Sequence, residues 1–392
     1  MAAETQHFKV DNGDMTLMEL QSGRTILVDI NIRKAADDAD DDDDTPDVAN
    51  QLRDALDRDS DGRLYVDAFM LTHPDKDHCA GLETHFHLGK IEDWSPEDDK
   101  IVIREMWSTP FFFHPASKDN PRCPDAKAWA KEAKRRVGVF EDEDSVEEGD
   151  RILILSEDDD GNTDGLDDIL VEAGDTFSAI CGHSNEGFEA VLLAPLPVDE
   201  DDDEDELQSK NNTSAVTRFT LAQDDAEDAA QYLFCGDAEV AVLEKIWNEY
   251  GSTPEVLQYD VLISPHHCSW HSLSHDSWSE KGRDGEVSKD ARSALSQAND
   301  GAIILASSKE IEDDDSDPPC IGAKEEYEDI LSSNGTDGDF RCLAEENGDK
   351  PFKLEITEHG PKPAALAVAA VMSTSTAIGV EAQAHGCRNK DS

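Results

Sequence analysis

Residues 72–78 of this chain read THPDKDH, and they directly follow an apolar run, LYVDAFML, at residues 64–71. The apolar run predicts a buried strand, and the polar residues predict a tight loop at its carboxyl end. Four side chains of the loop carry groups that commonly bind metal ions: His73, Asp75, Asp77 and His78. Imidazole and carboxylate ligands together suit Zn, Mn or Fe. Four such groups within six residues favour a metal site over four separate structural roles.

Two later segments have the same design, an apolar run that ends in ligand-type residues. Residues 232–237 read YLFCGD and end in Asp237, and residues 262–267 read LISPHH and end in His266 and His267. A single Gly-Asp pair is weak evidence because it is a common turn. Its value here comes from the two other segments, which deliver similar groups at predicted strand ends.

The rest of the chain predicts strands with helices between some of them and no internal repeat. Helices are expected at residues 48–56, 125–137 and 239–250. Strands are expected at residues 15–20, 25–30, 101–107, 151–155, 189–193, 215–221, 231–234, 261–264, 302–307 and 353–357. This order predicts an α+β or α/β fold in which helices pack on mixed sheets.

The 392 residues carry 91 acidic and 34 basic side chains, a formal net charge of −57. Such a charge excludes a general coating protein for DNA or anionic membranes, which needs a cationic surface. Acidic residues occur along nearly the whole chain, which favours a carboxylate-rich surface of the halophilic kind over acidic tails on an ordinary protein. The eight cysteines include no CxxC pair, so a zinc ribbon or a small disulfide scaffold does not fit.

Acidic runs and composition suggest how the chain is divided. We expect one domain over residues 1–360, with acidic loop insertions near 37–47, 141–150, 199–210 and 311–318, and a tail over 361–392. The start of the chain has no apolar core of signal-peptide length, so a cytoplasmic location is expected. Residues 364–380 are apolar but rich in alanine and hydroxyl groups, and a membrane span usually needs about 20 strongly apolar residues.

The motifs in their order carry a resemblance to a known family. They read HPDKDHCAGL at 73–82, NNTS at 211–214, FCGDAE at 234–239 and SPHHCSWHS at 264–272. Together they resemble the metallo-β-lactamase superfamily, and more narrowly the hydrolase domain of the competence protein ComEC family, here without a membrane domain. The opening segments VDNGD at 10–14 and GRTILVD at 23–29 resemble that family's first hairpin and its buried aspartate. The resemblance extends from about residue 8 to about residue 357 and implies a four-layer αβ/βα sandwich with a metal site at the edge of two mixed sheets.

The resemblance also implies roles for individual residues. One metal ion would take Asp77, His78 and one of the His266–His267 pair, with His267 favoured. The second ion would take His73 with Asp75 beside it, and Asp237 would bridge the two. Asp77 and His266 would be the catalytic residues, with His266 facing the substrate. Supporting residues would be Asp29, which orients the first loop, Asn211 or Asn212 where relatives outside the subfamily have another histidine, and Ser269, which shapes the loop after the His-His pair.

The expected metal depends on one difference between this sequence and the usual motif of the superfamily. The superfamily's usual motif is HxHxDH, and Asp75 stands here where the middle histidine is usual. With asparagine at the later position, one half of the site becomes rich in oxygen, which favours Mn²⁺ or Mg²⁺ over Zn²⁺. Two divalent ions, Mn²⁺ or Zn²⁺, are therefore the expected cofactors.

The expected function is a dinuclear metal-dependent hydrolase that uses a metal-activated water, chiefly on phosphodiester bonds in the manner of a nuclease. The alternatives are hydrolysis of a small phosphodiester, hydrolysis of a lactone or thioester, and a catalytically slow binding or regulatory protein on the same fold. DNA is a candidate substrate, no membrane insertion is expected, and a separate membrane or DNA-processing partner is a candidate.

Two features of the sequence each allow two interpretations. Lys127, Lys131 and Lys134 share one face of an expected helix, where they would hold a phosphate backbone or, more commonly, pair with acidic loops. Cys79, Cys235 and Cys268 each adjoin a ligand segment. Their usual role is to pack as small apolar side chains, and the alternative is a redox-sensitive or thiol-liganded site.

Overall fold

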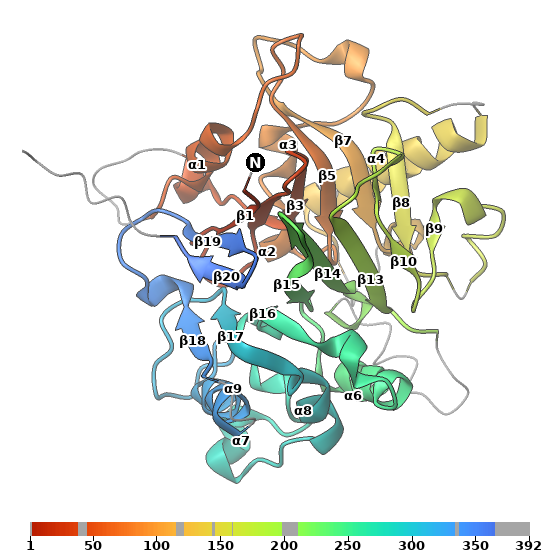
Figure 1. The fold of residues 1–392 in the computed structure, drawn as a ribbon. Helices are drawn as coiled ribbons and strands as arrows, with labels where there is room; N and C mark the ends of the chain where they lie inside the picture. Colours follow the sequence, from red (N-terminus) through yellow and green to blue (C-terminus); the bar gives the residue numbers. More distant parts are fainter. Residues whose placement is uncertain are drawn as a thin grey trace, which may run out of the picture.

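The computed structural model describes residues 2–37, 45–114, 121–142, 146–158, 160–197, 211–333 and 337–364. Two mixed sheets face each other, and helices flank them (Figure 1). The expected fold class, two mixed sheets flanked by helices, is therefore confirmed.

The larger sheet has ten strands in the order β20-β19-β1-β2-β3-β5-β7-β8-β9, with β6 also paired to β7. Their bounds are β1 (Glu4–His7), β2 (Thr16–Glu19), β3 (Thr25–Val28), β5 (Tyr65–Leu71), β6 (Phe86–His87), β7 (Ile101–Ser108), β8 (Arg151–Leu155), β9 (Leu170–Val171), β19 (Phe352–Thr357) and β20 (Gly360–Pro363). β4 (Ile30–Asn31) makes isolated bridges to residues 79 and 80.

The second sheet has seven strands in the order β10-β13-β14-β15-β16-β17-β18. They are β10 (Thr176–Phe177), β13 (Phe188–Ala194), β14 (Val216–Gln223), β15 (Ala226–Phe234), β16 (Tyr259–Ile263), β17 (Ala298–Ala306) and β18 (Asp339–Cys342). A separate hairpin pairs β11 (Ala179–Ile180) with β12 (His183–Ser184). The helices are α1 (Val48–Ala55), α2 (Lys76–Cys79), α3 (Leu82–His85), α4 (Pro124–Asp142), α6 (Val240–Tyr250), α7 (Trp278–Lys281), α8 (Lys289–Leu295) and α9 (Ile321–Ser333).

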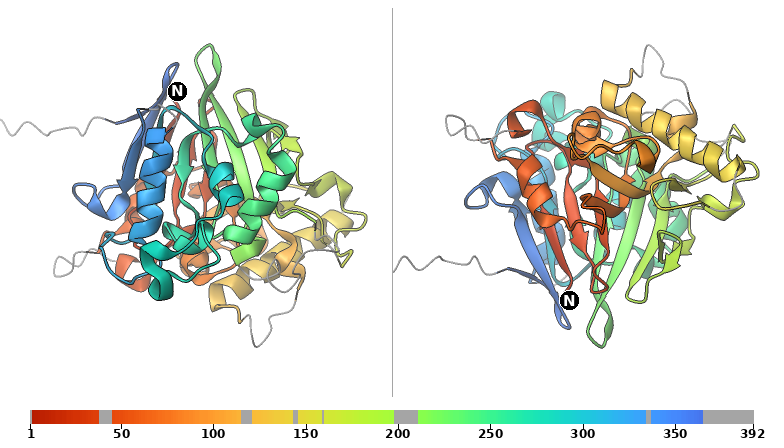
Figure 2. Two further views of the ribbon diagram at one scale, coloured as in Figure 1. Left: turned by 90° about the horizontal axis from the view of Figure 1, so that it is seen from below. Right: turned by 90° about the horizontal axis from the view of Figure 1, so that it is seen from above.

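Alternation along the strands separates the apolar side chains into three cores. In β3, Ile26 and Val28 join the core between the two sheets, whereas Leu27 joins the core beneath α1 and α4. In β16, Leu262 faces the third core, which α6, α8 and α9 cover. Figure 2 shows α9 and α6 across one face of the molecule and α4 across the opposite face. The layers are thus helix, sheet, sheet, helix, because both faces of each sheet are apolar and must be covered.

The first strand, β1, is absent from the sequence-based prediction, and its composition explains why. Its residues Thr5, Gln6 and His7 are polar yet almost fully buried. The Thr5 hydroxyl is 2.9 Å from the Tyr232 hydroxyl of the opposite sheet, and His7 Nδ1 is 3.0 Å from Thr16 Oγ1. Hydrogen bonds replace apolar contacts here, so the strand has no alternating hydrophobic pattern to detect.

Parallel pairing brings the functional loops to one edge. β3 pairs in parallel with β5, and β15, β16 and β17 also run parallel to one another. The carboxyl ends of parallel neighbours lie at the same edge of a sheet, and loops at such ends are the usual place for ligand sites. The segments after β3, β5, β15 and β16 meet in this way.

The expected division into residues 1–360 and a tail stays a prediction. The core between the sheets includes residues from Ala3 to Ile356, and β20 continues the larger sheet to Pro363. Residues 365–392 lie outside the described part of the chain, as do the insertion at 199–210 and parts of those at 37–47 and 141–150. Among the described residues, no helix combines the length and the apolar character needed to cross a bilayer.

Candidate metal centre

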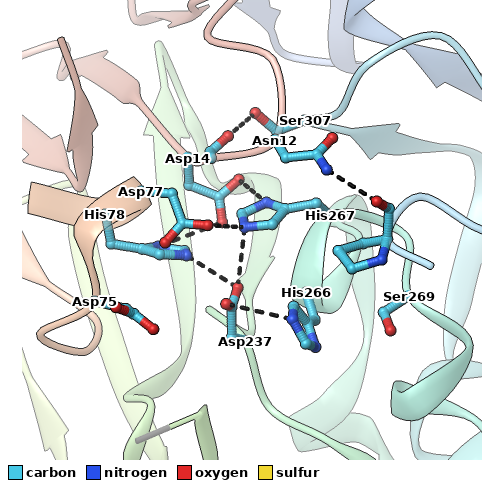
Figure 3. Close-up of polar contacts among 12 residues, drawn as sticks. Asn12, Asp14, Asp75, Asp77, His78, Asp237, His266, His267, Ser269 and Ser307 are labelled. Atoms are coloured by element: carbon cyan, nitrogen blue, oxygen red, sulfur yellow. Dashed lines mark hydrogen bonds and ion pairs between the residues drawn. The ribbon is translucent and has the colours of Figure 1, made fainter. Parts of the chain in front are cut away.

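Four buried side chains from four separate segments converge at the edge where the loops meet (Figure 3). Asp14, His78, Asp237 and His267 each offer one ligand atom, and these atoms all lie within 4.8 Å of one another. Asp14 precedes β2, His78 lies in α2, Asp237 follows β15 and His267 follows β16. The group has the composition and the spacing of a metal-binding site.

Asp29 fixes the loop that carries the first histidines. One of its oxygens accepts hydrogen bonds from the Thr72 hydroxyl at 2.6 Å and from His78 Nδ1 at 2.8 Å, and the other accepts from the Thr72 backbone nitrogen at 2.7 Å. A carboxylate only accepts, so His78 carries its proton on Nδ1 and turns Nε2 inward. The Thr72 hydroxyl in turn lies 3.2 Å from His73 Nδ1, which turns His73 Nε2 in the same direction.

The turn that presents Asp237 depends on a close approach between two loops. Gly236 has φ +51°, and a Cβ at this position would lie 2.9 Å from Thr72 Oγ1 and 3.0 Å from the Ser214 side chain. The Ser214 hydroxyl accepts a hydrogen bond from the Asp237 backbone nitrogen at 3.1 Å. Glycine is required here both for the left-handed backbone and for the space.

Asn211 and Asn212 support the same turn from the far side. Asn211 Nδ2 donates to Glu239 Oε1 at 2.9 Å, and Asn212 Oδ1 accepts from the Glu239 backbone nitrogen at 3.2 Å. Both asparagines therefore hold the start of α6, two residues after Asp237.

The His-His turn has a strained backbone. His266, His267 and Cys268 have φ values of 49°, 53° and 68°. A left-handed conformation of a residue other than glycine costs on the order of 1–3 kcal/mol and is characteristic of functional sites. The His266 backbone nitrogen donates to Gly236 O at 2.9 Å, and the Ser269 hydroxyl donates to Asp317 Oδ1 at 2.7 Å. These contacts fasten the turn to the Asp237 loop and to the segment before α9.

The two oxygens of Asp237 face different pairs of imidazoles. Asp237 Oδ1 lies 2.9 Å from His78 Nε2 and 3.3 Å from His267 Nε2. Asp237 Oδ2 lies 3.5 Å from His73 Nε2 and 3.7 Å from His266 Nε2. Two ligands of one cation at bond lengths of about 2.0–2.2 Å are separated by roughly 3.0–3.5 Å. The distances from Asp237 to His267 and to His73 fall in this range, and those to His78 and His266 lie just outside it.

Several buried atoms at this point have no hydrogen-bond partner, and they test whether a cation fits. The partnerless atoms include Asp14 Oδ1, Asp237 Oδ1 and the Nε2 atoms of His73, His78 and His267. Buried polar atoms without partners are costly, and a bound ion is one of their standard explanations. The donor set of imidazole nitrogens and carboxylate oxygens supports that explanation, so the residues fit a divalent metal ion.

Charge coupling in the cluster shifts the pKa values of its members. Burial alone would raise the pKa of Asp237, but the imidazoles of His78 and His267 outweigh it and hold that pKa well below its usual range. Burial opposes protonation of His78 and His267, but the Asp237 carboxylate outweighs it and raises the pKa of both. Asp14 differs, because burial raises its pKa to about 6 against the opposing effect of the two histidines.

The remaining expected site residues surround this cluster at different distances. Asp77 Oδ2 lies 3.5 Å from His267 Nε2, and the Asp77 side chain is 38% exposed. The His266 side chain is 15% exposed. Asp75 caps α2 by accepting a hydrogen bond from the Lys76 backbone nitrogen at 2.8 Å, and it is not part of the four-residue cluster.

Asp14 is a candidate ligand that the sequence pattern does not predict. The VDNGD segment at residues 10–14 resembles only an opening hairpin in the sequence, although it places the Asp14 carboxylate directly after Gly13. A Cβ on Gly13 would lie 2.2 Å from Asn31 Nδ2 and 2.7 Å from Asp77 O, so this loop passes directly against the metal loop. Asn31 Nδ2 donates to Val10 O and Asn12 O and holds the loop in place.

Neither a scan against protein-family models nor a search of curated proteins found a match to this chain. Two mixed sheets with a buried His/Asp cluster are compatible with a metallo-β-lactamase-like fold. The structure thus defines an α/β sandwich protein with a candidate metal centre, and membership of that superfamily stays a proposal.

Proposed function

We propose that this chain is a metal-dependent hydrolase with a dinuclear centre, related to the metallo-β-lactamase superfamily, that acts on phosphodiester bonds. The observation that carries the proposal is the position of Asp237. Each of its oxygens faces its own pair of imidazole nitrogens, as a carboxylate must if it is to bridge two cations. His78 and His267 would hold one ion, with His73 and His266 on the side of the other.

The chain's own residues would divide the work between holding the ions and meeting the substrate. Bound divalent ions would supply an activated water and neutralise charge that develops on a phosphate. Asp29 holds His78 in the tautomer that a cation requires. Asp77 and His266 are the partly exposed members of the group, so they are placed to contact a substrate that enters from solvent.

A basic face on α4 supports a polyanionic substrate. Lys127, Lys131 and Lys134 are exposed along this helix, and within the described ranges none of them forms an ion pair. Arg135 and Arg136 of the same helix instead pair with Glu132. Pairing of the three lysines with acidic loops, the commoner outcome, is therefore not seen in the described part of the chain. The same helix contacts α2, which carries Asp77 and His78.

The net charge of −57 favours a second candidate, a small phosphodiester. Such a substrate brings little charge of its own, so it avoids most of the repulsion that a polynucleotide would meet at low salt. The two candidates share the same centre and differ only in whether the lysine face takes part.

The function is tested by metal analysis paired with turnover. The chain, supplied with Mn²⁺ or Zn²⁺, is assayed by elemental mass spectrometry and on a bis-aryl phosphodiester. Asp237→Asn is expected to lose both metal and turnover, and the exposed Asp57→Asn serves as the matched control. Metal bound without turnover on any phosphodiester would favour the slow binding protein, and turnover of only a lactone or thioester would favour that alternative. A chain that binds neither ion would overturn the proposal.

A further inference from the structure

Two thiols are in contact beside the loop of residues 72–78, which carries His73, Asp77 and His78. Cys79 Sγ lies 3.6 Å from Cys123 Sγ, although the two residues are 44 positions apart in the chain. Cys79 ends α2 and directly follows His78, whereas Cys123 directly precedes α4. The pair therefore lies where α2, the helix that carries Asp77 and His78, contacts the longer helix α4.

The two thiols differ in exposure and in hydrogen bonding. Cys79 is fully buried, and its thiol donates to Asp75 O at 2.9 Å. Cys123 is only half-buried, and its sulfur accepts a hydrogen bond from the Ala126 backbone nitrogen at 3.3 Å. When the Cys79 thiol turns its single proton from Asp75 O to the Cys123 sulfur, that hydrogen bond, followed by the one from Ala126, lowers the pKa of Cys123 to about 6 against the opposing effect of burial. Cys123 is thus the reachable, nucleophilic member of the pair, because the thiolate is the reactive form.

We propose that Cys79 and Cys123 form a reversible disulfide when a hydroperoxide reaches Cys123, and that the disulfide weakens the metal centre. The Cys123 thiolate attacks the terminal peroxide oxygen and the O–O bond breaks; the other oxygen leaves as hydroxide from hydrogen peroxide, or as alkoxide from an organic hydroperoxide, and the sulfur becomes a sulfenic acid. As Cys79 gives its proton to the sulfenic oxygen, the Cys79 sulfur attacks the Cys123 sulfur, the S–S bond forms, the S–O bond breaks, and the oxygen leaves as water. Two thiols are oxidised by two electrons and one hydroperoxide is reduced; a dithiol reverses the change by exchange.

Disulfide formation removes a contact that shapes the metal loop. The oxidised sulfur of Cys79 has no proton, so its hydrogen bond to Asp75 O is lost. Asp75 caps α2, and α2 carries Asp77 and His78. The two sulfurs must also move together, which pulls the carboxyl end of α2 towards α4. This second half of the inference rests on the proposed metal centre, whereas the first half rests on the thiols alone.

The thiol half is tested on the full chain with hydrogen peroxide as the probe. After treatment, alkylation of free thiols and peptide mass mapping are expected to show a peptide that links Cys79 to Cys123 and disappears with dithiothreitol. Cys123→Ser should abolish the link with little effect on folding, because Cys123 is half-buried. Cys387→Ser, a cysteine in the part of the chain outside the described residues, is the control and should retain it. A map that leaves both thiols free, or that joins Cys123 to another cysteine, would overturn the inference.

The metal half is measured on the same samples. Oxidised chain is expected to bind Mn²⁺ or Zn²⁺ about tenfold more weakly than reduced chain, in the range found when the support of a metal ligand is disturbed. Cys123→Ser should show no such loss after peroxide. Equal affinity in a chain with a mapped disulfide would contradict the effect on the metal centre. Absence of metal in both states would instead count against the proposed function and leave the thiol result standing.

Discussion

Single hydrogen bonds determine the orientation of the histidine rings in the candidate metal centre. The His78 side chain is fully buried, and Asp29 accepts the proton of its Nδ1 at 2.8 Å. The same Asp29 oxygen holds the Thr72 hydroxyl, which in turn contacts His73 Nδ1. One carboxylate outside the cluster therefore sets the orientation of two imidazoles that face Asp237.

Asp29→Asn tests this role with almost no change in size. An amide can present its NH₂ group to His78 or Thr72, which disrupts the accepting pattern, so metal affinity should fall about 10–100-fold. Titration of the metal-free chain with Mn²⁺ or Zn²⁺ measures the loss, and circular dichroism checks that the fold is retained. Wild-type affinity in a folded variant would show that Asp29 does not position the site.

Protons and metal compete for the same nitrogens. The raised pKa values of His78 and His267 favour the protonated form of both rings in the metal-free chain. Metal binding must displace those protons, so affinity should rise with pH and binding should release protons. Calorimetric titration in two buffers of different ionisation enthalpy counts the released protons, and the count should fall in His78→Gln but not in the exposed His275→Gln.

The same shifts fix how the stability of the metal-free chain depends on pH. A histidine whose pKa is higher in the folded chain stabilises it fully below the unfolded pKa, about 6.5, and loses that contribution as pH rises through the folded value. Urea unfolding with a chelator present should therefore give a lower free energy of unfolding at about pH 8.5 than at about pH 6.5. His78→Gln should flatten this dependence, and a slope equal to that of the parent chain would contradict the assignment.

At the scale of elements, the site is made by short turns at strand ends. The turn after β15 touches the loop after β5, and the turn after β16 is bonded to it through Gly236 O. Each turn contains a left-handed backbone that the neighbouring loop holds in place. The centre is therefore as sensitive to turn geometry as to its ligands.

Gly236→Ala tests that sensitivity. A Cβ at this position meets Thr72 Oγ1 at 2.9 Å and carries a φ of +51°, so stability should fall by roughly 1–3 kcal/mol and metal affinity should fall with it. Gly62→Ala is the matched control, since Gly62 has φ +82° and an added Cβ would meet nothing within 4 Å. The control should lose some stability but no metal affinity. Equal effects of the two variants on metal binding would disprove the role of the close approach.

The lysine face of α4 is a second feature at this scale. Replacing Lys127, Lys131 and Lys134 with glutamate should lower turnover of single-stranded DNA at least about tenfold, because each phosphate contact contributes a salt-dependent share of binding. Turnover of the bis-aryl phosphodiester should not change. The control replaces three exposed lysines elsewhere, Lys281, Lys289 and Lys350, with the same charge change. Parallel losses in the two triple variants would indicate a general charge effect and favour the small substrate.

The sequence predicts elements well where one physical rule dominates. Apolar runs such as residues 151–155 become strands with the expected bounds, and the ligand-type residues after residues 71, 234 and 263 do follow strand ends. The sequence does not predict β1, because hydrogen bonds rather than apolar packing hold this strand. The sequence does not predict Asp14 as a site residue, because its position depends on a contact between Gly13 and the loop of Asp77. No local sequence pattern reveals that contact. Long-range contacts of this kind need the assembled fold.

At the scale of the whole molecule, the excess of negative charge is the main feature that affects stability. The formal net charge is −57, and most of the described ion pairs involve partly exposed side chains such as Arg283 and Arg292. Exposed pairs contribute little, about 0–1 kcal/mol each. Repulsion among the unpaired carboxylates therefore opposes the compact state unless salt screens it.

We expect the thermal midpoint to rise by several degrees between low salt and molar KCl. The screening length falls from about 10 Å at about 0.1 M to about 3 Å at about 1 M, so most of the rise should occur below about 0.5 M. Stabilisation by exclusion of salt from apolar surface would instead continue to grow at higher concentration. Circular dichroism melts in KCl, with sucrose as an uncharged comparison, separate the two effects. A midpoint that does not change up to molar KCl would show that carboxylate repulsion does not limit the stability of this chain, and that its acidic surface serves another purpose.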